Sequence, residues 1–309
     1  MLKKFDWISG EAVQLVKPFR VIFILLCLIT VSALSAFGEA RSLDDIKDSG
    51  LIRIAVYTDY PPFSFIENDS PTGIDVDIAR EIASALDVEL ELIWMTPGET
   101  TEDDFRNYLW KGHIIHRIKA DVMMRAPYDP SFSQKRDDVG LLVNELVHMF
   151  APYHRESWQI IHNTQTLPEV ETMGMFQYYT IGAEIDSIPH FYLTSAFGGR
   201  LREKTSHYGS NAEAFDAMRA GTVEAVMGMR SQISYLSQFV DNEQYRLASN
   251  AFPLIGKQKW DIGLAVHTNF RALGYEIGDV ITRMVVEGDM QRLFEKYKTI
   301  YEIPPYFAG

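Results

Sequence analysis

Cysteine and positive charge are both scarce in this sequence. Among 309 residues there is a single cysteine, Cys27, and 29 lysines and arginines are outnumbered by 42 aspartates and glutamates, which gives a formal net charge of −13. A lone cysteine excludes a disulfide framework within the chain. An acidic chain also lacks the basic footprint that duplex binding requires, so nucleic acid is not an expected partner.

Low-complexity segments and internal repeats are also missing. The composition is typical of a folded globular protein, because 47% of the residues are hydrophobic and 23% are charged. Disorder, collagen and coiled coil are therefore excluded. The length allows one large domain or two of ordinary size.

The first forty residues have the pattern of an export signal. Four basic residues lie within residues 1–20, and residues 21–34 (VIFILLCLITVSAL) carry no charge. Small residues follow, so cleavage is expected after Ala33, Ala36 or Ala40. This predicts a Sec-type signal peptide over residues 1–40 and a periplasmic protein. The alternative is an uncleaved N-terminal anchor, although the apolar run is shorter than the ~20 residues of a membrane span.

Cys27 lies inside this apolar run and follows Leu26 rather than a small residue, which argues against a lipoprotein signal. Cleavage would leave a mature chain without any cysteine. An exported chain of this size without disulfides suits a bacterial periplasm, since its core is large enough to be stable alone.

Apolar patterning predicts a first α/β unit. Period-two or β-branched runs alternate with segments in which apolar residues recur every four positions. The predicted strands are residues 51–57, 88–94 and 121–124, and the predicted helices are residues 74–86 and 103–118. Strands that alternate with helices indicate a parallel sheet with crossover helices.

A second α/β unit follows without a Ser- or Gly-rich linker. Its predicted strands are residues 158–161, 179–183, 224–227 and 260–266, and its predicted helices are residues 211–220, 231–239, 272–286 and 289–297. Two units in series without a linker predict two lobes that share hinge strands.

Several short segments, taken in order, carry a family resemblance. They are Leu51–Tyr57 with the following Tyr60-Pro61-Pro62-Phe63, and then residues 73–79, 120–124, 151–153, 217–226 and 263–266. In this order and spacing, the chain from about residue 51 to residue 297 resembles the bacterial extracellular solute-binding proteins of family 3. These are the amino-acid-receptor class of periplasmic binding proteins.

The resemblance implies an α/β fold of the periplasmic binding protein type II kind, in which two α/β lobes joined by hinge strands close on a small-molecule ligand. The expected lobes are residues 41–155 with 259–309, and residues 156–258. The expected partner is an inner-membrane ABC permease, with no cofactor and no metal. Three alternatives stay open: a conventional amino-acid receptor whose ligand-binding arginine lies at another position, an accessory protein of a periplasmic dehydrogenase, and a cyclohexadienyl dehydratase-like enzyme.

The family's carboxylate-binding arginine has no obvious counterpart in the first lobe. An insertion over about residues 131–146 leaves Arg125, Arg136 and Arg155 as candidates, and Arg125 is preferred because it directly follows a predicted buried strand. Arginine can bind a carboxylate or phosphate through two parallel hydrogen bonds. The competing interpretation of Arg125 is a salt bridge with Asp129 or another nearby acid.

The second lobe departs from the family pattern as well. Asp186 and Ser187 stand where the family places an anion-binding turn, and Met229 follows the strand at the position expected to hold an ammonium-binding acid. The predicted ligand-binding residues are Tyr60, Phe63, Arg125, Tyr128, Tyr153, Asp186, Ser187 and Met229. Because this set is rich in aromatic and thioether groups, it predicts an apolar or amphipathic ligand rather than a standard amino acid.

Signals for catalysis are few. His154 lies near the expected hinge, where a histidine can act as a general acid or base. His113 and His116 are three residues apart, which is too few ligands for a metal site. The sequence has no nucleophile elbow, P-loop or dinucleotide fingerprint, so a binding protein without catalysis is the preferred interpretation.

Overall fold

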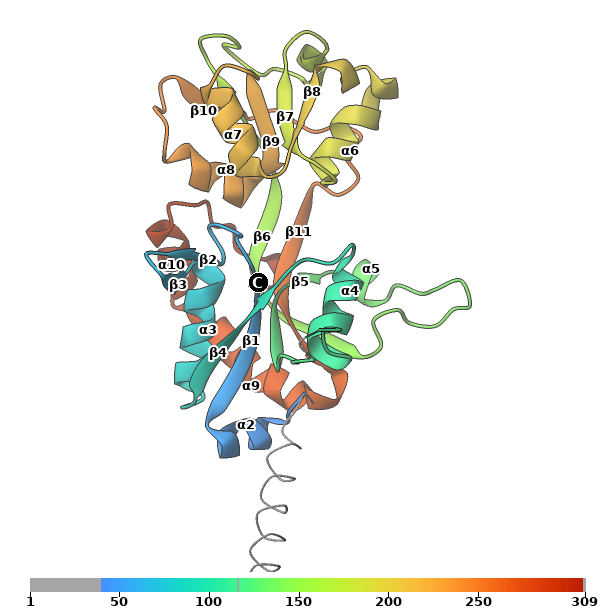
Figure 1. Ribbon diagram of the computed structural model, residues 1–309, viewed down its shortest axis with the longest axis vertical. Helices are drawn as coiled ribbons and strands as arrows, with labels where there is room; N and C mark the ends of the chain where they lie inside the picture. Colours follow the sequence, from blue (N-terminus) through green and yellow to red (C-terminus); the bar gives the residue numbers. More distant parts are fainter. Residues whose placement is uncertain (1–39, 116, 308–309) are drawn as a thin grey trace, which may run out of the picture.

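The protein folds into two α/β lobes joined by two long strands (Figure 1). The computed structural model describes residues 40–115 and 117–307. The predicted signal peptide lies outside these residues, apart from Ala40. None of the helices in the described part of the chain combines the length and apolar character needed to cross a membrane.

The first lobe is built on a parallel sheet. Strand β1 (Leu51–Tyr57) lies between β4 (Glu89–Met95) and β5 (Val122–Tyr128) and runs parallel to both. The covering helices are α2 (Leu43–Ser49), α3 (Ile74–Ala85), α4 (Thr101–Phe105), α9 (Arg271–Val286) and α10 (Asp289–Lys296). Isoleucines of β1 and α3 pack with α9 and α10 in one buried cluster, which explains the spacing of four in the helical sequences.

The second lobe repeats this plan on a smaller scale. Its strands are β7 (Ile181–Glu184), β8 (Thr205–Tyr208), β9 (Ala225–Met229) and β10 (Tyr245–Leu247), and its helices are α6 (Ile188–Ser195), α7 (Asn211–Arg219) and α8 (Arg230–Ser237). Strand β7 pairs in parallel with both β8 and β9. The lobe has hydrophobic clusters of its own, separate from those of the first lobe.

Two antiparallel strands connect the lobes. Strand β6 (Val147–Asn163) and strand β11 (Lys259–His267) pair with each other, and β6 continues into the second sheet beside β9 (Figure 1). Strand β6 runs across the predicted lobe boundary at residues 155/156, and β11 begins at the predicted boundary at residues 258/259. The expectation of two lobes that share hinge strands is confirmed.

Most predicted elements are present, but the predicted helix over residues 103–118 is wrong in its second half. After α4, a π-helical turn (Arg106–Trp110) ends shortly before Gly112, which adopts a φ of +90°. The described residues between Gly112 and Asp121 form no further helix, because a glycine in the left-handed region favours a helix end.

The predicted insertion forms a loop that projects from the first lobe (Figure 1). It begins with α5 (Pro130–Ser133) and contains a bridge between Arg136 and Leu142. A small hairpin, β2 (Phe65–Glu67) and β3 (Ser70–Thr72), completes the lobe.

Candidate ligand-binding cleft

A cavity of about 650 Å³ lies between the two lobes. The first lobe contributes the segment after β1, the segment after β4, and Arg125 of β5. The second lobe contributes the starts of α6, α7 and α8, and the hinge strands contribute Trp158, Trp260 and Ile262. In the first lobe this is the edge where parallel strands end, which is where ligands of open α/β sheets bind.

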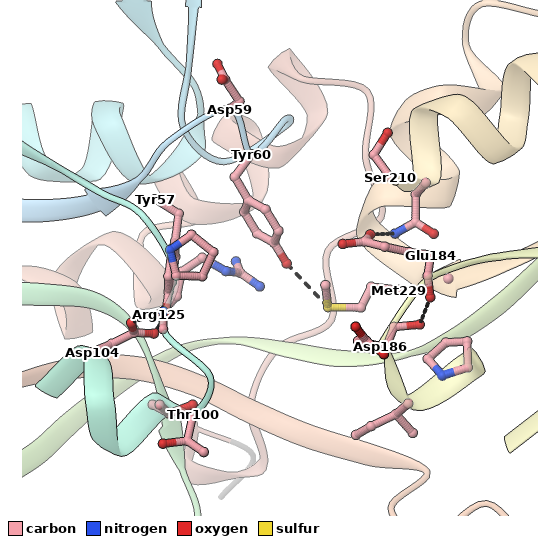
Figure 2. Close-up of a pocket in the computed structure, with 18 of the residues that line it drawn as sticks. Tyr57, Asp59, Tyr60, Thr100, Asp104, Arg125, Glu184, Asp186, Ser210 and Met229 are labelled. Atoms are coloured by element: carbon pink, nitrogen blue, oxygen red, sulfur yellow. Dashed lines mark hydrogen bonds between the residues drawn. The ribbon is translucent and has the colours of Figure 1, made fainter. Parts of the chain in front are cut away.

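Arg125 forms the floor of the cavity on the first-lobe side (Figure 2). Its backbone adopts a φ of +60°, an uncommon conformation for a residue other than glycine. The guanidinium carbon lies 3.6 Å from the centre of the Phe63 ring and 5.2 Å from that of Tyr60. The side chain is 7% exposed, and its buried Nη1 has no hydrogen-bond partner among the described residues. This nitrogen therefore carries a donor that no described residue uses.

Asp75 lies in the same buried region as Arg125. It is fully buried at the start of α3, and the Tyr153 hydroxyl donates to its Oδ1 over 2.7 Å, while Oδ2 has no partner among the described residues. Burial raises the pKa of Asp75 to about 6, although the charge of Arg125 opposes this shift. For Arg125, burial favours the neutral form, but nearby Tyr60, Tyr153 and Asp75 outweigh it and raise the pKa. The arginine therefore stays charged.

Acidic side chains outnumber basic ones in the wall of the cavity. The lining holds five carboxylates, and Arg125 is its one basic residue in the described chain. The carboxylates are Asp59, Glu99, Asp104, Glu184 and Asp186. Both lobes contribute to this set, so a ligand between them would face negative charge on two sides (Figure 2).

Two of these carboxylates are held in place by hydrogen bonds. The Tyr57 hydroxyl and the Gly98 amide each donate to Asp104 over 2.7 Å. On the opposite wall, the Asn211 side-chain amide donates to Glu184 over 3.0 Å. Burial raises the pKa of both Asp104 and Glu184. Each group is a fixed hydrogen-bond acceptor, which suits recognition of an ammonium or guanidinium.

The lobes touch across the cleft. The Tyr60 hydroxyl donates to the sulfur of Met229 over 3.6 Å (Figure 2). Burial raises the pKa of this hydroxyl to about 12, so it remains protonated. Tyr60, Trp158 and Trp260 line the cavity, and their ring faces can form cation–π contacts with a ligand.

Five of the predicted site residues line the cavity: Tyr60, Arg125, Asp186, Ser187 and Met229. Phe63 and Tyr153 are fully buried, Phe63 against the Arg125 guanidinium and Tyr153 on Asp75, so they support the floor without lining it. Tyr128 packs edge-on against Tyr306 and does not line the cavity either.

The structure also decides between the open interpretations of the charged residues. Asp129 pairs with Lys257, so the expected salt bridge between Arg125 and Asp129 is wrong. Arg136 is exposed and donates to the Gly140 carbonyl, and Arg155 lies 3.7 Å from Asp261 on the hinge. Ser187, rather than Asp186, caps α6 by accepting from the His190 amide.

Sequence reasoning missed Tyr57, Asp104, Glu184, Trp158 and Trp260. Glu184 ends β7, and Asp104 follows β4 in the next helix, so strand-end position was an available signal for both. The two tryptophans reach the cleft because the hinge strands pass beneath it. Their role depends on strand pairing between Trp260 and Glu156 that the sequence does not reveal.

His154 does not reach the cavity. It is fully buried between the rings of Phe294 and Tyr301, and its Nε2 lies 3.4 Å from Glu156. Burial lowers the pKa of His154 and keeps it neutral. A buried histidine away from the cavity cannot act on a solute held there.

The structure offers no metal site within the part of the chain that it describes, where no three His, Cys, Asp or Glu side chains converge. His113 stacks on Tyr108, while His116 lies outside the described residues.

Comparison with known proteins agrees with this geometry. The family model of the bacterial extracellular solute-binding proteins, family 3, matches residues 52–103. The L-cystine-binding protein TcyJ of Escherichia coli K12 is 20% identical over 275 residues, which cover 88% of this chain and 91% of that protein. The chain is therefore similar to the family 3 solute-binding proteins, as its sequence resemblance predicts.

Solved structures with the same fold are those of type II periplasmic binding proteins, which confirms the predicted fold class. An ancestral cationic amino acid solute-binding protein superposes with a TM-score of 0.65 at 19% identity, over 83% of this chain and 99% of that one. An amino acid ABC transporter substrate-binding protein from Streptococcus pneumoniae, solved with L-arginine, gives a TM-score of 0.61 at 18% identity, over 85% and 100%.

One enzyme also matches, over a short segment. The cyclohexadienyl dehydratase of Pseudomonas aeruginosa is 35% identical over 79 residues, which cover 25% of this chain and 30% of the enzyme. None of these relatives is described as a dehydrogenase accessory protein, so that alternative has no support from them.

Proposed function

We propose that this protein is a non-catalytic periplasmic receptor that captures a small, positively charged solute between its lobes and delivers it to an ABC permease. The observation that carries the proposal is the charge of the cavity, whose described lining holds five carboxylates from both lobes and one arginine. Charges of one sign in a cleft attract ligands of the opposite sign.

The two walls suggest how such a ligand is oriented. A cationic group between Asp104 and Glu184 would meet acceptors from both lobes, and an oxygen of the same ligand would accept from Arg125 Nη1. Only the closed arrangement makes both contacts, so binding favours closure by its differential affinity for that state. Export to the periplasm would use the signal over residues 1–40.

This proposal replaces the apolar ligand that the sequence predicts. Aromatic residues are present in the cleft as expected, but buried or partly buried carboxylates stand beside them. An uncharged apolar ligand would desolvate these groups without pairing them, which is costly. A cation satisfies them, and it also uses the aromatic faces.

A thermal-shift panel of cationic, anionic and neutral solutes tests the proposal. We expect cationic solutes to raise the melting temperature, since ligands that bind only the folded state stabilise it. Glu184→Gln should weaken binding of the best cation about tenfold, because a hydrogen bond to a charged group contributes about 1.5–3 kcal/mol. Glu203→Gln, an exposed change elsewhere in the second lobe, is the matched control. A preference for anions, or no loss in the Glu184 variant, would contradict the proposal.

The dehydratase-like enzyme is a second candidate, favoured by the local match to the Pseudomonas enzyme. Its prephenate-like substrates are acids, which the five carboxylates of this cavity would repel. Incubation of the protein with prephenate, followed by product detection, separates the two functions. Turnover would establish the enzyme.

A further inference from the structure

A basic and apolar loop lies at the base of the first lobe. The basal loop comprises residues 111–115 and 117–119, with His116 outside the described residues. Its isoleucines are unusually exposed: Ile114 is 87%, Ile115 is 74% and Ile118 is 37% accessible. Single exposed apolar side chains are common on protein surfaces. A group of them side by side is typical of an interaction site.

The charge of the basal loop opposes that of the whole chain. Lys111, Arg117 and Lys119 are its charged residues, and none of the three forms an ion pair with another described residue. The whole chain, these three residues included, carries a net charge of −13. The neighbouring His267 is affected by Lys119, whose charge, together with burial, lowers the histidine pKa.

The loop lies at the end of the lobe that faces away from the cleft. Residue 120 follows it directly, and its amide donates to the Tyr108 carbonyl before β5 begins. Parallel strands β1 and β5 start at this end, whereas Tyr57 and Arg125 contact the cavity further along the same two strands. Ligand exchange therefore stays possible when the basal loop is covered.

The described chain also begins at this end of the lobe. Arg41 pairs with Asp121 over 2.6 Å, which fixes the start of the described chain beside the residues that follow the loop. Residues 1–39 precede it in the sequence, and their uncharged run ends at residue 34. Helix α2 lies at this end as well and carries three aspartates and one lysine: Asp44, Asp45, Asp48 and Lys47. Its net charge is negative, so the positive charge at this end is confined to the basal loop.

We propose that the basal loop binds an anionic lipid surface. Its isoleucines would enter the boundary between headgroups and acyl chains, and its three cations would face lipid phosphates. A protein partner fits less well, since the cores of protein interfaces are depleted in lysine and these isoleucines are flanked by cations. This inference does not depend on which solute the cleft binds.

The test uses the full chain with Cys27→Ser and Ile115→Cys, labelled at position 115 with an environment-sensitive fluorophore and mixed with phosphatidylglycerol–phosphatidylcholine vesicles. Leu254→Cys in the same background is the control, because Leu254 is 73% exposed but lies in the second lobe. We expect a blue shift of the label at position 115 that weakens with salt, and none at position 254. Changing Lys111, Arg117 and Lys119 to Gln should lower vesicle binding by the loop roughly fivefold for each cation removed.

Three outcomes would overturn the proposal. They are no shift at position 115, an equal shift at position 254, and an equal shift with vesicles of phosphatidylcholine alone. A shift that appears without vesicles as the protein concentration rises would identify a second copy of the chain as the occupant instead. Far-UV circular dichroism of each labelled variant separates these outcomes from misfolding.

Discussion

Arg125 and Asp75 occupy one buried region beneath the cleft, and their contacts explain how a charged side chain is kept there. The guanidinium stacks on Phe63, and Tyr153 donates to the carboxylate over 2.7 Å. Burying a charge is expensive unless it is compensated. The arginine is stabilised by ring faces and the nearby carboxylate, and it retains an unpartnered donor for a ligand.

Asp75 should make the stability of the protein depend on pH in an unusual direction. Its pKa rises on folding from an ordinary 3.8 to about 6, because burial disfavours the charged form. Between pH 4 and 6 the folded state therefore binds more protons than the unfolded state, so this contribution to stability is lost as pH rises. A shift of this size corresponds to roughly 3 kcal/mol.

The measurement is urea unfolding of the wild type and Asp75→Asn at several pH values from 4 to 7. The free energy of unfolding of the wild type should fall relative to that of the variant as pH rises. Asp77→Asn is the matched control, because the pKa of Asp77 is shifted in the opposite direction. Burial raises the pKa of Asp77, but hydrogen bonds from Lys296 and Tyr297 outweigh burial and lower it. A constant difference between wild type and Asp75→Asn would refute the assignment.

At the scale of elements, the turn between β1 and α3 positions the cleft. Gly73 directly precedes α3 and has a φ of +127°, and the Ile74 and Asp75 amides donate to the Pro62 and Phe63 carbonyls. These bonds hold the Tyr60–Phe63 segment against the helix that carries Asp75. The floor of the cavity therefore depends on a close approach between two backbones.

Gly73→Ala should destabilise the fold strongly. A Cβ at this position would lie 2.2 Å from the Phe63 carbonyl oxygen, and the backbone conformation is one that side chains rarely allow. Gly50→Ala is the control, because Gly50 also has a positive φ of +65° but open space around it. We expect a loss of about 1 kcal/mol at Gly50 and of more than about 3 kcal/mol at Gly73, measured by urea unfolding. Similar losses at both positions would contradict the importance of this contact.

The elements were largely predictable from the sequence, whereas the composition of the site was only partly so. The periodicity of α3 and the β-branched run of β1 depend on local packing, which patterns report well. Asp104 and Glu184 are brought opposite each other by the pairing of β6 with β11 and β9, which no local pattern encodes. The helix predicted through Ile118 failed because the positive φ of Gly112 ends it.

At the scale of the whole molecule, the C-terminal segment ties the lobes together. After α10 the chain runs to the hinge, where Glu302 pairs with Arg230 of the second lobe at 2.5 Å and with Lys259 of β11 at 2.7 Å. The Thr299 hydroxyl donates to the Ser231 carbonyl at 2.6 Å in the same region. These contacts constrain how far the second lobe can swing away.

Glu302→Gln should therefore weaken the connection between the lobes. The glutamate is 28% exposed and Arg230 is 12% exposed, so water screens this pair only in part. We expect the free energy of unfolding to fall by about 1–2 kcal/mol in urea. Glu287→Gln, an exposed change at the end of α9, is the control. Equal stability of the Glu302 variant and the wild type would show that the pair is not part of the hinge.

The central claim is that the cleft holds a positively charged solute. The most direct measurement is mass spectrometry of the small molecules released by denaturing natively purified protein, followed by calorimetric rebinding of each compound. The charge of the cavity predicts a cationic compound that rebinds in a one-to-one ratio and binds more weakly to Glu184→Gln. Recovery and rebinding of an anionic or uncharged apolar compound would contradict the account.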